Sequence, residues 1–126
     1  MKDSILIIDD SMVARKQVAL AIEALGYHAI EAEDGTNGWN QLEQRQNDIL
    51  LVILDWNMPG LSGIEVLRKI RSDQRFRSIP VMMVTTETER ENMIEAVRAG
   101  ATQYVMKPYT HEDLQIKVLQ CLGMNP

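Results

Sequence analysis

The residues of this sequence that are best suited to chemistry are polar side chains that directly follow apolar runs. Asp55 ends the longest of these runs, "ILLVIL". A carboxylate at the end of a buried segment costs free energy unless a partner or a ligand requires it there. Other apolar runs end in the same way, and the full set of candidate site residues is Asp9, Asp10, Asp55, Thr85 and Lys107. Each one alone is also typical of a helix cap or a turn, so the argument depends on whether the chain brings them together.

Three carboxylates in one crevice repel one another unless a cation joins them. Carboxylate oxygens favour Mg²⁺ over Zn²⁺, and the sequence has no Cys/His cluster that would suggest otherwise. We expect Asp9 and Asp10 to hold the metal, with Asp55 beside it.

With a divalent cation and Lys107 added, the charges of this site nearly cancel, and such a site can accept a phosphoryl group. A carboxylate that attacks phosphorus forms an acyl phosphate. Asp55 is the expected nucleophile because it comes from the central run. Thr85 and Lys107 are expected to contact the phosphoryl oxygens.

The elements that must position these residues alternate between short apolar runs and longer amphipathic stretches. Strands are predicted over 5–8, 28–32, 49–54, 81–84 and 103–106. Helices are predicted from the cap Ser11 to the stop at Gly26, over 36–45, after the loop "DWNMPGLSG", over 89–99, and from a capping box at Thr110 and Asp113 onward. In the third helix, the side chains of Arg68, Lys69 and Arg71 are expected to point mostly outward.

This pattern predicts an α/β fold, a flavodoxin-like (βα)5 three-layer sandwich that forms one domain over residues 1–126. The strand order 2-1-3-4-5 is taken from known folds of this kind and does not follow from the sequence itself. With that order, the strands that end in Asp9 and Asp55 are neighbours, at the edge where ligands of open α/β sheets bind.

Composition excludes several classes of function. The net charge of −5 leaves no basic footprint for nucleic acid or an anionic membrane, and no apolar run approaches the ~20 residues that span a bilayer. The single cysteine, Cys121, is expected to be a small buried or half-buried residue on the last helix. A cytoplasmic location is the default expectation.

Four motifs, in this order and spacing, resemble the receiver domain of bacterial two-component response regulators: "LIIDDS", "VILDWNMPGLSG", "MMVTTE" and "YVMKPYT". "DWNMPG" and the pair Asn57 and Glu87 resemble the stand-alone chemotaxis regulators in particular. The resemblance implies that a histidine kinase phosphorylates Asp55, with Asp9, Asp10 and the backbone carbonyl of Asn57 on Mg²⁺.

The resemblance also implies roles for residues around this site. Thr85 and Tyr104 would change position together as the switch, and Pro108 would follow a cis Lys107–Pro108 bond. Asn57 and Glu87 would flank the path of the attacking water and so tune autodephosphorylation.

Two residues depart from the family pattern. Thr86 stands where the family prefers Ala or Gly, and the larger side chain should narrow access to the acyl phosphate. Ser11 stands where the chemotaxis proteins often carry an aromatic residue. This difference weakens the inference that the chain binds the same partners as that subgroup.

The expected partners are a histidine kinase and a protein that binds the phosphorylated form, either a flagellar motor switch or a histidine phosphotransfer protein. The reading face would carry Met93, Arg98, Tyr104 and Tyr109, although Met93 and Met82 are by default core residues. Trp39 is expected in the core and Trp56 half exposed.

Alternatives stay open at this point. The chain could be a phosphorelay intermediary or phosphate sink without motor binding, or a receiver that is not phosphorylated. A haloacid-dehalogenase-type phosphatase would need a second Asp where Asn57 stands, because an amide cannot shuttle the proton. A flavin-binding module would need a phosphate cradle where "DDSMV" places two anions.

Overall fold

The computed structural model describes residues 2–86 and 90–124. Its strands are β1 (Ser4–Ile8), β2 (His28–Ala32), β3 (Ile49–Asp55), β4 (Val81–Thr86) and β5 (Gln103–Lys107). Its helices are α1 (Met12–Glu23), α2 (Gly35–Gln44), α3 (Gly63–Ser72), α4 (Arg90–Ala99) and α5 (His111–Cys121). The predicted alternation of strand and helix is therefore confirmed.

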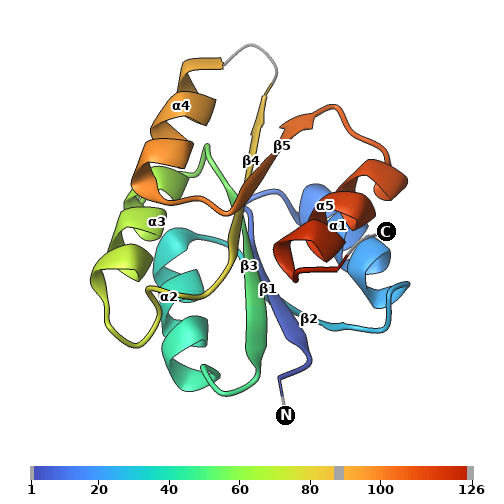
Figure 1. The fold of residues 1–126 in the computed structure, drawn as a ribbon, viewed down its shortest axis with the longest axis horizontal. Coiled ribbons are helices and arrows are strands. Elements are labelled where there is room, and N and C mark those ends of the chain that lie inside the picture. Colours follow the sequence, from blue (N-terminus) through green and yellow to red (C-terminus); the bar gives the residue numbers. More distant parts are fainter. Residues whose placement is uncertain (1, 87–89, 125–126) are drawn as a thin grey trace.

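The five strands form one parallel sheet of order β2-β1-β3-β4-β5, as predicted. Figure 1 shows the sheet nearly edge-on, with α2, α3 and α4 on one side and α1 and α5 on the other. Helices on both faces explain why the central runs are apolar at every position, since neither face meets water.

Successive residues of each strand supply the two halves of the core in turn. On β3, Val52 and Leu54 pack with α2, α3 and α4, whereas Leu51 and Ile53 pack with α1 and α5. This period of two is the normal alternation of a pleated strand. Because each strand is packed against helices on both faces, its carboxyl end has a fixed position between the two helical layers.

Side-chain caps start four of the described helices. The predicted caps are present: the Ser11 hydroxyl accepts a hydrogen bond from the Ala14 amide, and Thr110 and Asp113 form a capping box. A second capping box, Ser62 with Glu65, opens α3. The motif "SGIE" in the sequence carries the Ser-x-x-Glu signal that is typical of this cap.

Some predicted boundaries were wrong by one or two residues. Strand β3 includes Asp55 itself, and β4 extends through Thr86. The predicted start of the fourth helix at Glu89 lies outside the described residues. No helix in the described part of the chain has the length and hydropathy needed to cross a membrane.

The two tryptophans and the two methionines fit their expected environments in part. Trp39 packs edge-on against Phe76 at 5.4 Å, and Trp56 is half-buried beside the core. Met82 is fully buried, whereas Met93 is only half-buried and lines a surface groove. The expectation of a core role for Met93 was therefore wrong in part.

Arg71 was expected to point outward, and that prediction was wrong. Its guanidinium donates hydrogen bonds to the carbonyl of Ile79 (2.7 Å), the carbonyl of Gly100 (2.9 Å) and the hydroxyl of Thr102 (3.4 Å). A long side chain can start on an outward-facing position and still reach inward, because its stem lies along the protein surface. Arg71 thus ties α3 to the segments that precede β4 and β5.

We expect Arg71→Met to lower the free energy of unfolding by about 2 kcal/mol, because two backbone carbonyls lose a charged donor. Urea denaturation followed by circular dichroism measures the change. Arg77→Met, which removes an exposed arginine, is the matched control and should change stability by less than about 0.5 kcal/mol. Equal losses in the two variants would contradict the role assigned to Arg71.

Candidate functional site

Strand register brings two of the predicted carboxylates to the same height in the sheet. Ile8, the last residue of β1, pairs with Leu54 on β3. Asp9 and Asp55, the next residue in each segment, therefore lie side by side. Asp10 lies in the turn that follows. One carboxylate oxygen from each of the three aspartates lies within 4.8 Å of the others. Sequence reasoning that grouped these residues by strand ends is supported by this geometry.

The other side of the site comes from β4 and β5. Asp55 pairs with Val84 on β4, so the buried Thr85 lies one position beyond it. The Lys107 ammonium, at the end of β5, lies 3.6 Å from Oδ1 of Asp55 and 3.9 Å from Oδ2 of Asp9. All five residues predicted from strand ends therefore converge at one edge of the sheet.

The carboxylates of this site are removed from water to different degrees. Asp9 is 5% exposed, Asp55 6% and Thr85 3%, whereas Asp10 is exposed. Burial, followed by the neighbouring Asp9 carboxylate, raises the pKa of Asp55 to about 6, although the Lys107 ammonium acts in the opposite direction. Burial also raises the pKa of Asp9, against the hydrogen bond from Ser11.

Two backbone hydrogen bonds of Trp56, the next residue in the chain, fix the position of Asp55. The Trp56 amide donates to the Val84 carbonyl at 2.9 Å, and the Gly63 amide donates to the Trp56 carbonyl at 3.1 Å. Gly63 approaches so closely that a Cβ built on it would lie 2.2 Å from the Asp55 carbonyl oxygen. The first turn of α3 therefore packs directly on the backbone of Asp55.

The donor set of this site fits a hard divalent cation. Three carboxylate oxygens converge from two segments, and one ammonium lies within 4 Å of Asp55 and Asp9. Oxygen-only ligands of this kind suit Mg²⁺, Ca²⁺ or Mn²⁺ better than Zn²⁺. Without a cation, a charge of −3 on the carboxylates faces one positive charge, which leaves the site strongly attractive to a metal.

Comparison with known proteins places this arrangement in a family. Residues 5–119 match the family model described as "Response regulator receiver domain". The chain belongs to the response regulator receiver domain family. Because the match covers nearly the whole chain, the earlier alternatives of a haloacid-dehalogenase-type phosphatase and a flavin-binding module are not supported.

The curated relatives of this receiver domain include chemotaxis proteins. "Chemotaxis protein CheY1" of Helicobacter pylori is 38% identical over 122 residues, covering 96% of this chain and 98% of that protein. "Chemotaxis protein CheY" of Pseudomonas aeruginosa is 42% identical over 115 residues, covering 90% and 91%. Among solved structures, the chemotaxis response regulator CheY4 of Vibrio cholerae has a TM-score of 0.88 at 29% identity, covering 97% of this chain and all of that one.

The remaining predicted residues that the structure describes come from the loop after β3, from β4, and from β5 and the bond that follows it. Asn57 is exposed in the loop after β3, and Thr86 is half-buried at the end of β4. Tyr104 is half-buried on β5 and packs against the core beside β4. The Lys107–Pro108 bond is cis. Glu87 lies outside the described residues.

Sequence reasoning missed several residues that shape this site. Tyr109 was expected only on the reading face, yet burial and the charges of Asp9 and Asp55 raise the pKa of its phenol. Gly63 and Arg15 also contact the backbone of the candidate ligands. A glycine or an arginine in a helix carries no spacing signal, so only the tertiary structure reveals these contacts.

Proposed function

We propose that this receiver domain is a single-domain response regulator, comprising residues 1–126, whose Asp55 accepts a phosphoryl group from a histidine kinase in a Mg²⁺-dependent reaction. The observation that carries the proposal is the convergence of the Asp9, Asp10 and Asp55 oxygens within 4.8 Å, with the Lys107 ammonium 3.6 Å from Asp55. Similarity to chemotaxis proteins over nearly the whole chain supports a role in chemotaxis.

In the proposed transfer, a carboxylate oxygen of Asp55 attacks the phosphorus of a phosphohistidine. The new P–O bond forms as the P–N bond breaks, and the imidazole leaves with the bonding electron pair and takes up a proton. The burial that raises the pKa of Asp55 makes the ionised carboxylate costly, and it therefore favours neutralisation of that charge by a bound cation.

Asp9, Asp10, Asp55 and the backbone carbonyl of Asn57 are the residues that we propose for Mg²⁺. The ion supplies charge neutralisation for the phosphoryl oxygens. Lys107 would neutralise a second oxygen, and the Thr85 hydroxyl would donate to a third. The buried position of Thr85 suits this role, because a hydrogen bond from a buried donor meets little competition from water.

Phosphorylation is proposed to act through a population shift. The phosphoryl group adds about one negative charge and three acceptor oxygens at Asp55. Thr85 would move toward it, and Tyr104 on the neighbouring strand would turn into the space that Thr85 leaves. The register supports this pairing, because Met83 on β4 pairs with Tyr104 and Thr85 lies two residues further along the same strand.

The lifetime of the acyl phosphate is proposed to depend on residues beside the site. Asn57 and Glu87 would flank the approach of the attacking water. Thr86 would narrow that approach and slow autodephosphorylation. The positions of Asn57, two residues after the end of β3, and of Thr86, the last residue of β4, support these roles.

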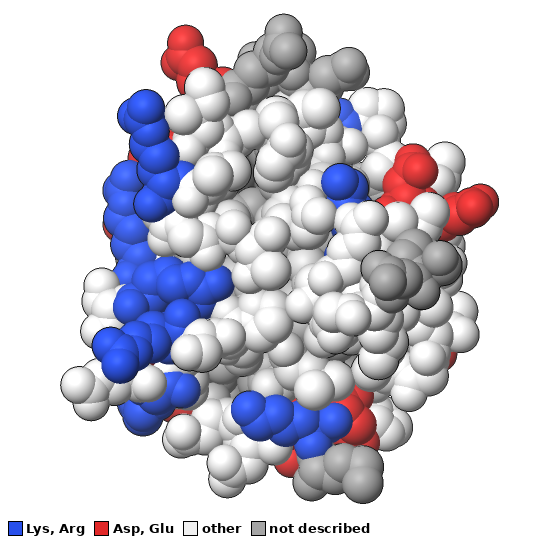
Figure 2. Space-filling model, in the orientation of Figure 1, with Lys and Arg blue, Asp and Glu red and all other residues white. Residues whose placement is uncertain are grey.

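The signal is proposed to leave through the surface formed by α4, β5 and α5. A groove there is lined by Met93, Ile94, Val97, Arg98 and Tyr104, and Ile94 and Val97 are each 58% exposed. Figure 2 shows that the surface between α4 and α5 is largely free of charged side chains, while Lys and Arg gather over α3 and α4. An exposed apolar groove of this kind supports a protein target, such as a motor switch or phosphotransfer protein.

Beryllofluoride, a phosphoryl mimic, tests the proposal. We expect it to change the fluorescence of the half-buried Trp56 only when Mg²⁺ is also present, because both groups must share the Asp55 carboxylate. Asp55→Asn should abolish the response completely. Intact-mass spectrometry after incubation with a small-molecule phosphodonor should likewise show one added phosphoryl group in the wild type and none in the variant.

Asp48→Asn, which changes a partly exposed carboxylate just before the start of β3, at the other end of the strand from Asp55, is the matched control and should respond like the wild type. Full beryllofluoride binding by Asp55→Asn, or binding by the wild type without Mg²⁺, would place the acceptor elsewhere and end the proposal.

A further inference from the structure

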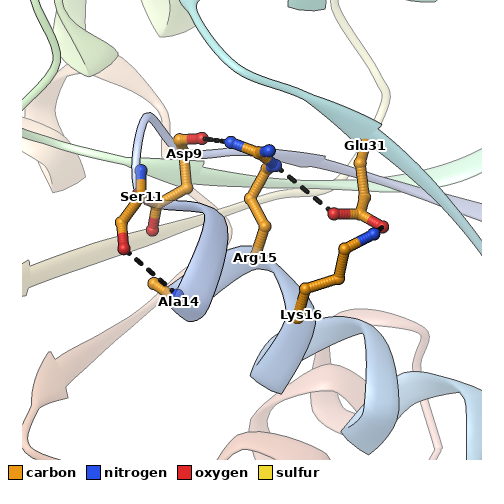
Figure 3. A network of polar contacts seen from close by, with 6 residues as sticks. All are labelled: Asp9, Ser11, Ala14, Arg15, Lys16 and Glu31. Atoms are coloured by element: carbon orange, nitrogen blue, oxygen red, sulfur yellow. Dashed lines mark hydrogen bonds and ion pairs between the residues drawn. The ribbon is translucent and has the colours of Figure 1, made fainter.

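Arg15 on α1 connects the backbone of a candidate metal ligand to the end of β2. Its Nη1 donates to the backbone carbonyl of Asp9 at 2.8 Å, and its Nε donates to Oε1 of Glu31 at 3.3 Å. Lys16 donates to the other oxygen of Glu31 at 2.8 Å. Figure 3 shows the guanidinium between Asp9 and Glu31, with one edge directed at each.

This network differs from an ordinary surface ion pair. The Arg15 side chain is only 12% exposed and that of Glu31 24%, whereas the Lys16 side chain is 62% exposed. The hydrogen bond from Lys16, with further help from Arg15, lowers the pKa of Glu31, so the carboxylate is held in its charged form. Solvent and salt screen the partly buried pair of Arg15 and Glu31 less than they screen an exposed ion pair. The Asp9 carbonyl fixes the arginine, and Lys16 binds the other oxygen of Glu31.

The network completes a set of contacts on every polar part of Asp9. The Asp9 amide donates to the Ala32 carbonyl at 3.1 Å, and its Oδ1 accepts from the Ser11 amide at 2.9 Å. Its Oδ2 lies 3.9 Å from the Lys107 ammonium, and Arg15 binds the remaining group, the backbone carbonyl. Strand β2 thereby holds Asp9 twice, directly through Ala32 and indirectly through Glu31.

We propose that Arg15 is a positioning residue for the metal site: by holding the Asp9 carbonyl against β2, it sets the β1–α1 turn so that the Asp9 and Asp10 carboxylates face Asp55. The inference rests on the proposed function, since it assigns Arg15 to the same Mg²⁺ site. Arg15 touches neither the metal nor the phosphoryl group in this role.

The direction in which the metal affinity changes when Arg15 is removed distinguishes a positioning role from a purely electrostatic one. Removing a positive charge near a cation site should tighten metal binding, because it removes a repulsion. Removing a positioning contact should weaken it, and groups that orient metal ligands commonly contribute 10- to 100-fold in affinity. Arg15→Met therefore gives opposite results under the two explanations.

Titration with MgCl₂, followed by ¹H–¹⁵N NMR shifts of the Ser11 and Asp10 amides, measures the Kd of the metal alone. We expect Arg15→Met to raise the Kd about tenfold. Lys16→Met removes the same charge from the exposed side of Glu31 and should leave the Kd within about twofold of wild type or lower it. Arg15→Lys can reach only one of the two acceptors at a time and should lie between Arg15→Met and the wild type.

Arg71→Met controls for loss of stability alone. It removes another partly buried arginine that binds backbone carbonyls, so it should lower the free energy of unfolding without changing the Kd for Mg²⁺. An unchanged or lower Kd in Arg15→Met would overturn the inference, and so would an equal rise in Lys16→Met or Arg71→Met. If Arg15→Met does not fold, Arg15→Lys decides by the same criterion.

Failure of the proposed function gives a different result. A wild-type protein with no saturable Mg²⁺ response would overturn the proposed function and the inference together. Saturable wild-type binding with an unchanged Kd in Arg15→Met would overturn the inference alone.

Discussion

Without divalent cations, Asp55→Asn should be more stable than the wild type by about 2–3 kcal/mol at pH 7.5. The pKa of Asp55 is raised from 3.8 to about 6, and each unit corresponds to about 1.4 kcal/mol. Asparagine keeps the shape of the side chain and removes the buried charge. A substitution that abolishes the proposed activity should therefore stabilise the fold.

The pH dependence follows from the direction of this shift. Because the folded protein holds the Asp55 proton more tightly than the unfolded chain does, wild-type stability should fall as the pH rises from about 4 to about 6. Above about pH 6 this loss is complete. The Asp9 pKa is also raised and adds to the loss in the same direction, and in Asp55→Asn only the smaller Asp9 contribution should remain.

Urea denaturation in EDTA across this pH range measures both effects. Adding MgCl₂ should stabilise the wild type more than Asp55→Asn and so narrow their difference, because the cation offsets the carboxylate repulsion. Asp48→Asn should show no comparable gain. If Asp55→Asn were less stable than the wild type in EDTA, the raised pKa would be contradicted.

Gly63→Ala should cost about 3 kcal/mol of stability and also weaken beryllofluoride binding. The added Cβ would lie 2.2 Å from the Asp55 carbonyl oxygen and 2.9 Å from the Cα of Trp56. Both contacts are backbone atoms at the end of β3, so the strand end or the first turn of α3 has to move. Alanine is otherwise the better helix residue by about 1 kcal/mol, which makes a loss of stability informative.

Gly38→Ala is the matched control within another helix. Its Cβ would lie 2.3 Å from Cδ1 and 2.7 Å from Cγ1 of Ile8, which are side-chain atoms rather than the backbone of the candidate site. We expect a smaller loss, about 1 kcal/mol, and unchanged beryllofluoride binding. Denaturation curves and Trp56 fluorescence compare the two variants, and a loss in Gly63→Ala no larger than in Gly38→Ala would contradict the close approach to Asp55.

The strand ends of this protein were predictable because they are local features. An apolar run followed by Asp, Thr or Lys is visible in the sequence, and the carboxyl ends of parallel strands meet at one edge. The strand order itself was not predictable in this way, since nothing in residues 5–8 specifies which strand lies beside them. That order came from resemblance, and the structure then confirmed it.

Two arginines show the limit of periodicity. Arg15 and Arg71 lie on amphipathic helices, and the helical period describes only where each Cβ points. Their guanidinium groups reach backbone carbonyls on segments that are distant in sequence: Asp9 for the first, and Ile79 and Gly100 for the second. Such contacts depend on the packing of three elements at once.

The arginine at the end of α3 also constrains how β4 and α4 can move. Arg71 holds the chain just before β4, at Ile79, and just after α4, at Gly100. The start and the end of the segment that contains β4 and α4 are therefore both bound to the same arginine. Thr85 lies toward the opposite end of β4. A change in the position of Thr85 can therefore occur while both ends of the β4–α4 segment stay bound to Arg71.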